Sequence, residues 1–144
     1  MFTDNMIAPC GLDCSICDLA LRGENPCPGC LGPNKNKPDF CADRCTIVHC
    51  AKRKENNYRY CDECPDYPCE PIVEIESRYT TRYPLRESAR ENLRMIRKSG
   101  MDSYLRHQKA EWTCENCGGT ISVHTGRCNK CNKQYGAAEK AIQW

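Results

Sequence analysis

The chain has little of the apolar material from which a large core is built. It contains two Phe and two Trp among 144 residues, and the hydrophobic fraction of 40% includes 15 cysteines. Without cysteine the apolar content is nearer about 30%. No apolar run approaches the roughly 20 residues that cross a bilayer, and residues 1–8 are too polar for a secretory signal. A core this small needs other stabilisation, and structural zinc supplies on the order of 10 kcal/mol per site.

Catalytic signatures are also missing. The three histidines are scattered, and we find no Ser/His/Asp grouping, no Gly-rich phosphate loop and no H-E-x-x-H pattern. The sequence therefore disfavours an enzyme without excluding one.

Cysteine is what the chain has in abundance. Ten of the 15 form C-x2-C pairs, a spacing that brings two thiolates to one tetrahedral metal. The odd total excludes complete disulfide pairing within one chain. Metal-bound thiolates and the absence of a signal predict a reducing, cytoplasmic location. The pairs are Cys14/Cys17, Cys27/Cys30, Cys61/Cys64, Cys114/Cys117 and Cys128/Cys131.

The last two pairs have the spacing of a zinc ribbon, with ten residues between Cys117 and Cys128. Gly118 and Asn132 follow the two knuckles, where the turn needs a residue that tolerates a left-handed backbone. The Thr120–Val123 stretch suits a strand of a β-hairpin. Four thiolates predict a closed, structural zinc site, with iron in a rubredoxin-like site as the rival.

Eleven further cysteines lie before residue 70. Cys14, Cys17, Cys27 and Cys30 are the best second four-sulfur site. The remaining seven could form two more sites if His49 were added, because Cys41, Cys45 and His49 would share one stripe of a helix. The alternative is that His49 is a surface residue and one thiolate bridges two metals or stays free. We treat His107 and His124 as non-ligands. The seven are Cys10, Cys41, Cys45, Cys50, Cys61, Cys64 and Cys69.

These sets predict about four zinc ions per chain. An iron–sulfur cluster in the N-terminal part is the alternative cofactor, since its ligands are also cysteines. The ferredoxin spacings are absent, which favours zinc.

The middle of the chain, residues 71–112, has no cysteine and reads as helical. Pro71 suits a first helical turn, and a second helix is expected from about Leu85 to Ser99, with Gly100 as its stop. Short helices are also expected near residues 15–22 and 42–55.

Charge separates along the chain. Residues 61–76 carry six acidic and no basic residues, and basic residues dominate 78–109. An Arg series with Arg86, Arg90 and Arg94 on one helical face could bind nucleic-acid phosphates. Because the two charge blocks nearly cancel, we favour a solvated face beside the acidic segment.

Together these features predict a small, metal-stabilised α+β protein. Its parts are an irregular cysteine-rich domain (1–70), a helical spacer packed on it (71–112), a zinc-ribbon β-hairpin (113–135) and a tail (136–144).

The chain contains a run from Met6 through Cys10-Gly-Leu-Asp-Cys14-Ser-Ile-Cys17, followed by Cys27-Pro-Gly-Cys30 and Cys61-Asp-Glu-Cys64-Pro-Asp-Tyr-Pro-Cys69. The order and spacing of these motifs resemble those of an uncharacterised prokaryotic cysteine-rich family of unknown function. The resemblance covers about residues 6–75. It implies zinc binding, which is assumed for that family, and no activity, substrate or catalytic residue. Cys41 and His49 do not belong to the family pattern.

The sequence thus predicts a zinc protein of unknown cellular role, with structural metals, acting as a binding module for an unidentified macromolecule and not at a membrane. An iron–sulfur redox protein is one alternative. Nucleic-acid binding through the basic helix and the ribbon is another.

Overall fold

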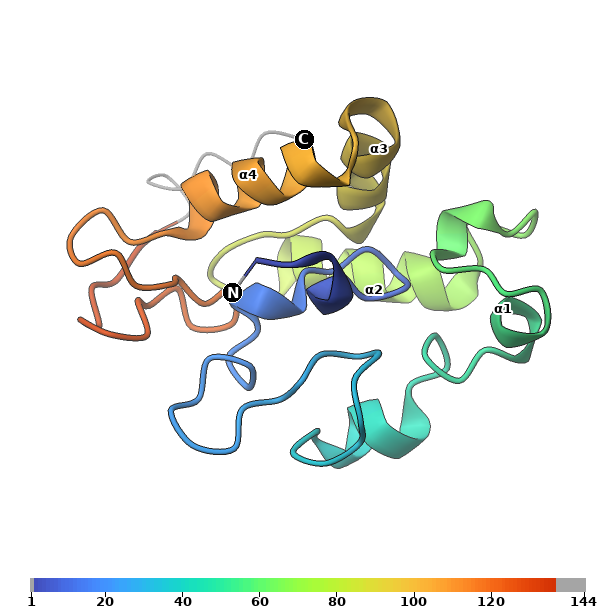
Figure 1. Ribbon diagram of the computed structural model, residues 1–144, viewed down its shortest axis with the longest axis horizontal. Helices are drawn as coiled ribbons and strands as arrows, with labels where there is room; N and C mark the ends of the chain where they lie inside the picture. The colour runs from blue at the N-terminus through green and yellow to red at the C-terminus, as the bar shows by residue number, and fades with distance from the viewer. Residues whose placement is uncertain (1, 137–144) are drawn as a thin grey trace.

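The architecture is helical and irregular in the computed structural model, which describes residues 2–136. Its α-helices are α1 (Ala51–Glu55), α2 (Glu70–Thr81), α3 (Ala89–Ser99) and α4 (Met101–Trp112). Shorter helical turns of three to five residues are η1 (Asp4–Met6), η2 (Cys14–Ile16), η3 (Phe40–Arg44) and η4 (Cys61–Glu63). Figure 1 shows α3 and α4 along one side of the molecule, α2 through its middle and the loops before α1 on the other side.

The three long helices follow from capping and apolar spacing. Pro71 lies in the first turn of α2, as expected. The side chain of Ser88 caps α3, where its Oγ accepts a hydrogen bond of 3.0 Å from the backbone N–H of Glu91. Gly100, with a φ of 87°, then ends α3 and leads directly into α4. The helical character predicted for the middle of the chain is confirmed.

One buried polar network joins the N-terminal loop to the helices. The backbone N–H of Asp13 donates to Glu87 Oε2 over 2.7 Å, and Gln108 Nε2 donates to Asp13 Oδ2 over 3.0 Å. Asn92 Nδ2 bridges Glu87 Oε2 at 3.0 Å and the carbonyl of Gly11 at 2.9 Å. Burial raises the pKa of both carboxyl groups. Because buried polar groups are costly unless paired, the network sets how this loop lies on α3 and α4.

A second junction is apolar. Ile16, which is 0% exposed, lies between two N-terminal cysteines in sequence but packs with Cys114, Ile121 and Cys128 of the C-terminal segment. The backbone N–H of Val123 donates to the Ile16 carbonyl over 3.0 Å. The two cysteine-bearing ends of the chain therefore share one core.

The predicted α+β class and C-terminal β-hairpin are wrong. Residues 113–135 contain no strand, and their pairing is limited to isolated bridges such as Ile121 with Cys128. The physical reason lies in the turns, since Gly118, Gly126 and Asn132 all have positive φ and leave only single residues free to pair. The N–H of Val123 also bonds outside the segment, to Ile16.

The N-terminal part is mostly irregular, as predicted, but the helix expected over 42–55 is interrupted. The π-type turn η3 ends at Cys45, whose ψ of 112° is extended, and α1 begins only at Ala51. Of the predicted tail 136–144, all but Gly136 lies outside the described residues. None of the helices in the described part combines the length and apolar content that a membrane span requires.

Candidate metal centre

Four thiols converge in the C-terminal segment. The sulfur atoms of Cys114, Cys117, Cys128 and Cys131 all lie within 4.8 Å of one another. The Cys114–Cys131 separation is 3.7 Å and the Cys117–Cys128 separation is 3.4 Å. A tetrahedral zinc with bonds of about 2.3 Å places its sulfur ligands about 3.8 Å apart. The four thiols therefore fit one tetrahedral ion, and within residues 2–136 no other group of three or more His, Cys, Asp or Glu side chains is as tight.

The backbone around these thiols is shaped for them. Gly118 and Asn132 have φ values of 78° and 61°, which confirms the left-handed residue expected after each knuckle. The N–H groups of Gly119 and Lys130 each donate to a cysteine sulfur over 3.4 Å. A Cβ at Gly119 would lie 2.7 Å from Cys128 Sγ, so only glycine fits there.

A hydroxyl group that sequence reasoning missed completes the site. Tyr135 Oη lies 3.2 Å from Cys114 Sγ, and this hydrogen bond lowers the pKa of the Cys114 thiol to about 6. The thiolate form that binds metal is thereby favoured. The only sequence signal for this role is an aromatic residue four positions after the last cysteine.

The site is buried on one side and exposed on the other. Cys114 and Cys128 are buried, whereas Cys117 and Cys131 lie at the exposed rim. Four protein ligands would fill the coordination shell of a zinc ion, which is the arrangement of structural rather than catalytic sites.

The N-terminal cysteines surround a cavity. A space of about 260 Å³ is lined by six of them together with apolar side chains. The Cys14 thiol donates to Cys30 Sγ over 3.6 Å, and this contact lowers the pKa of Cys30. Burial raises the pKa of Cys10. The six are Cys10, Cys14, Cys17, Cys30, Cys41 and Cys45.

Four other cysteines form a group around Cys61, which does not line the cavity but packs against the same core cluster as Cys10 and Cys14. Burial and then the nearby charge of Cys69 raise the pKa of Cys61 to about 12, and Cys50 and Cys64 act on it in the same direction. Cys50, Cys61 and Cys69 lie where α1, η4 and α2 begin, and Cys64 follows the end of η4. Cys27 lies in neither set, although its charge acts on Cys17. All 15 cysteines are free thiols.

The structure groups the thiols differently from the order along the chain. Cys41 and Cys45 face the same cavity as Cys14 and Cys17 and do not lie on a shared helical stripe with His49. The His49 ring is exposed, and its Nε2 lies 2.7 Å from the Ala42 carbonyl oxygen. The structure therefore does not bring His49 to the thiols.

A different histidine, His124, lies in the cavity wall. Its Nδ1 accepts a hydrogen bond of 3.1 Å from the N–H of Asp18, and its Nε2 lies 2.9 Å from Tyr79 Oη. Burial lowers the pKa of His124, which favours the neutral ring. Because Nδ1 is the acceptor, the proton of the neutral ring is on Nε2 and is donated to Tyr79. No spacing pattern in the sequence predicts that His124 and Tyr79 meet.

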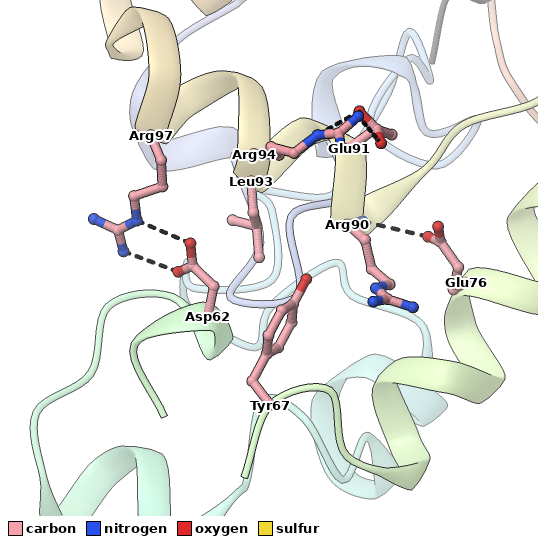
Figure 2. A pocket seen from close by; sticks show the side chains of 8 residues that line it. All are labelled: Asp62, Tyr67, Glu76, Arg90, Glu91, Leu93, Arg94 and Arg97. Carbon is pink, nitrogen blue, oxygen red and sulfur yellow. Dashed lines mark hydrogen bonds and ion pairs between the residues drawn. The ribbon is translucent and has the colours of Figure 1, made fainter. Parts of the chain in front are cut away.

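The three arginines predicted for nucleic-acid binding, Arg86, Arg90 and Arg94, are exposed, but their surface is balanced by carboxylates. Figure 2 shows side chains that line a groove beside α3, where Arg94 pairs with Glu91 and the Arg97 guanidinium pairs with Asp62. The groove has a volume of about 470 Å³. The two Arg97–Asp62 contacts measure 2.8 and 2.9 Å.

Helix α2 contacts this face as well, where the backbone N–H of Arg90 donates to Glu76 Oε1 over 3.3 Å. Arg86 precedes the first residue of α3, so it does not continue a helical stripe. The acidic and basic blocks of the sequence thus meet in one charge-balanced groove.

These features define a cysteine-rich protein in which a group of four thiols is able to bind a metal ion. Residues 6–74 match the family described as "Protein of unknown function (DUF3795)". The match confirms the resemblance to a family of unknown function, includes Cys10 to Cys69, and ends within α2, before the C-terminal group. Neither the curated proteins nor the solved structures gave a match.

Proposed function

We propose that the protein binds zinc at structural thiolate sites and acts as a binding module for a macromolecule. The observation that carries the zinc assignment is the convergence of four sulfur atoms within 4.8 Å of one another. Thiolate-only ligation favours zinc or iron over harder metals, and a filled tetrahedral shell leaves no position for a substrate. Free thiols suit a reducing compartment, the cytoplasm.

Elemental analysis and visible absorption of the anaerobically purified full chain test the metal. Zinc in a colourless protein is the expected result. A brown protein with iron and sulfide would overturn the proposal and favour the iron–sulfur alternative for the N-terminal part.

Substitution of one rim ligand tests the C-terminal site. Cys131→Ser should remove one zinc ion per chain, because three thiolates hold zinc less tightly than four. Lys130→Ala is the matched control, since it changes an exposed side chain between two ligands and keeps the backbone contact to Cys128. An unchanged zinc content in Cys131→Ser would contradict the assignment.

Nucleic acid is the second candidate partner, supported by the exposed side chains of Arg86, Arg90 and Arg94. Binding of DNA or RNA oligonucleotides should then fall steeply with salt and be lost in the triple alanine variant. Arg106→Ala, an exposed arginine of the neighbouring helix α4, is the control. Absence of binding at low salt would leave the macromolecule to be a protein.

A further inference from the structure

The N-terminal cavity has more thiols and more space than a single tetrahedral ion uses. Six cysteines line about 260 Å³, whereas the C-terminal group needs only four sulfur atoms within 4.8 Å. If one ion took four of the six, two thiols would be left facing the same buried space. Two tetrahedral ions that share two sulfur atoms use six thiolates, the stoichiometry of known Zn2Cys6 modules.

We infer that Cys10, Cys14, Cys17, Cys30, Cys41 and Cys45 form one binuclear metal–thiolate site, in which two thiolates bridge the two ions. This inference rests on the proposed zinc-binding function and assigns the cavity cysteines to one shared site instead of two separate ones. Within the cavity the Cys14–Cys30 separation of 3.6 Å matches the 3.4 and 3.7 Å of the C-terminal group. No three of the six thiols lie within 4.8 Å of one another, so metal binding would have to draw the remaining ligands inward.

The surroundings of the cavity suit an anionic centre. Two divalent ions with six thiolates carry a net charge of −2, which favours nearby cations and hydrogen-bond donors. Arg78 lies in the cavity wall, and Lys37 Nζ donates to the Cys30 carbonyl over 2.8 Å. Asp13 and Glu87 are also in the wall, where burial raises the pKa of both carboxyl groups and favours their neutral form.

Tyr79 contributes a donor of a specific kind. Because the His124 Nε2–H donates to Tyr79 Oη, the hydroxyl proton of Tyr79 stays available for another acceptor. Tyr79 lines the same cavity as the thiols, so within the inferred site its proton would be available to a thiolate. In the C-terminal site a tyrosine hydroxyl, that of Tyr135, lies 3.2 Å from Cys114 Sγ. The inference gives Tyr79 the corresponding role, that of a positioning residue for the binuclear centre.

Cadmium-113 NMR of the cadmium-substituted full chain tests the inference. Two ions joined by a bridging thiolate give a pair of resonances that are coupled to each other, whereas separate sites give uncoupled ones. We expect one coupled pair together with an uncoupled signal from the C-terminal group. If the C-terminal signal is present and no coupled pair is found, this inference fails while zinc binding stands. If the C-terminal signal is missing as well, the proposed function fails.

Single cysteine substitutions identify which thiols hold the two coupled ions. Cys41→Ser should abolish the coupling, and Cys69→Ser is the control because Cys69 lies outside the cavity and should leave it intact. The opposite pattern would overturn the assignment. The C-terminal signal reports in each variant that the chain has folded.

Tyr79→Phe should keep the coupled pair but release its ions to a chelator about 10- to 100-fold faster, as loss of an outer-shell hydrogen bond does. Unchanged release would exclude the role given to Tyr79.

Discussion

Replacing Ile16 with alanine should weaken both cysteine-bearing parts of the chain at once. Ile16 is 0% exposed and packs in the core that contains Cys114 and Cys128. Ile16→Ala removes three buried carbons, which at about 0.8 kcal/mol each amounts to about 2.4 kcal/mol before any cavity is counted. Buried Ile→Ala changes cost about 2–5 kcal/mol in total. We expect a loss of stability within that range.

Urea unfolding of the metal-loaded protein, followed by helical circular dichroism at a fixed zinc concentration, measures this loss. Fixing zinc is essential because bound metal itself raises the unfolding free energy. Val73→Ala is the control, since Val73 in α2 is 51% exposed and should change stability by no more than about 0.5 kcal/mol. A shift for Ile16→Ala no larger than the control would refute the shared core.

The same variant allows a second measurement, made at the C-terminal metal site. Ile16 is far along the chain from Cys114 and Cys128 but touches the core they belong to. Ile16→Ala should therefore speed zinc release from the C-terminal group to a chelator. Release at the wild-type rate would show that the contact does not support that site.

Three further predictions concern single side chains. Tyr135→Phe removes the hydroxyl on Cys114 and should lower zinc affinity of the C-terminal group about 10- to 100-fold in chelator competition, whereas equal affinity would deny the contact a role. The pKa of Glu87 is raised in the folded state, so ionisation of this carboxyl opposes folding. The stability advantage of Glu87→Gln over wild type should therefore grow as pH rises above about 4 and then level off. A pH-independent difference between the two proteins in urea unfolding would contradict this prediction. Gly11→Ala should destabilise the chain by more than about 1–2 kcal/mol, the cost of placing a non-glycine residue in the left-handed region. The reason for the larger loss is that φ is 103° and the new Cβ would lie 2.2 Å from the Ala89 carbonyl oxygen. A variant that unfolds at the wild-type temperature would refute this prediction.

The sequence was most informative where local rules decide the outcome. The helices around Ser88 and Gly100 follow from a cap and a stop that act over one turn. The convergence of the four C-terminal thiols is encoded in the C-x2-C spacing and in Gly118 and Asn132.

Long-range contacts could not be predicted in the same way. The hairpin prediction is wrong in part because the backbone N–H of Val123 donates to the carbonyl of Ile16, more than one hundred residues away. No pattern in the sequence predicts that hydrogen bond. The same holds for His124 and Tyr79, which meet at the cavity from separate segments. Their partners are decided by packing, and periodicity reports only on neighbours along a helix or strand.

The junction at Ile16 also bears on where the chain can be divided. The family match ends at residue 74, yet Ile16 lies inside the matched segment and shares a core whose other buried members begin at Leu85. A fragment cut at the end of the match would expose that side chain and leave the Asp13 backbone N–H without Glu87. The two cysteine-bearing ends should consequently gain and lose structure in one cooperative transition, so that the boundary of the family similarity is not a boundary of folding.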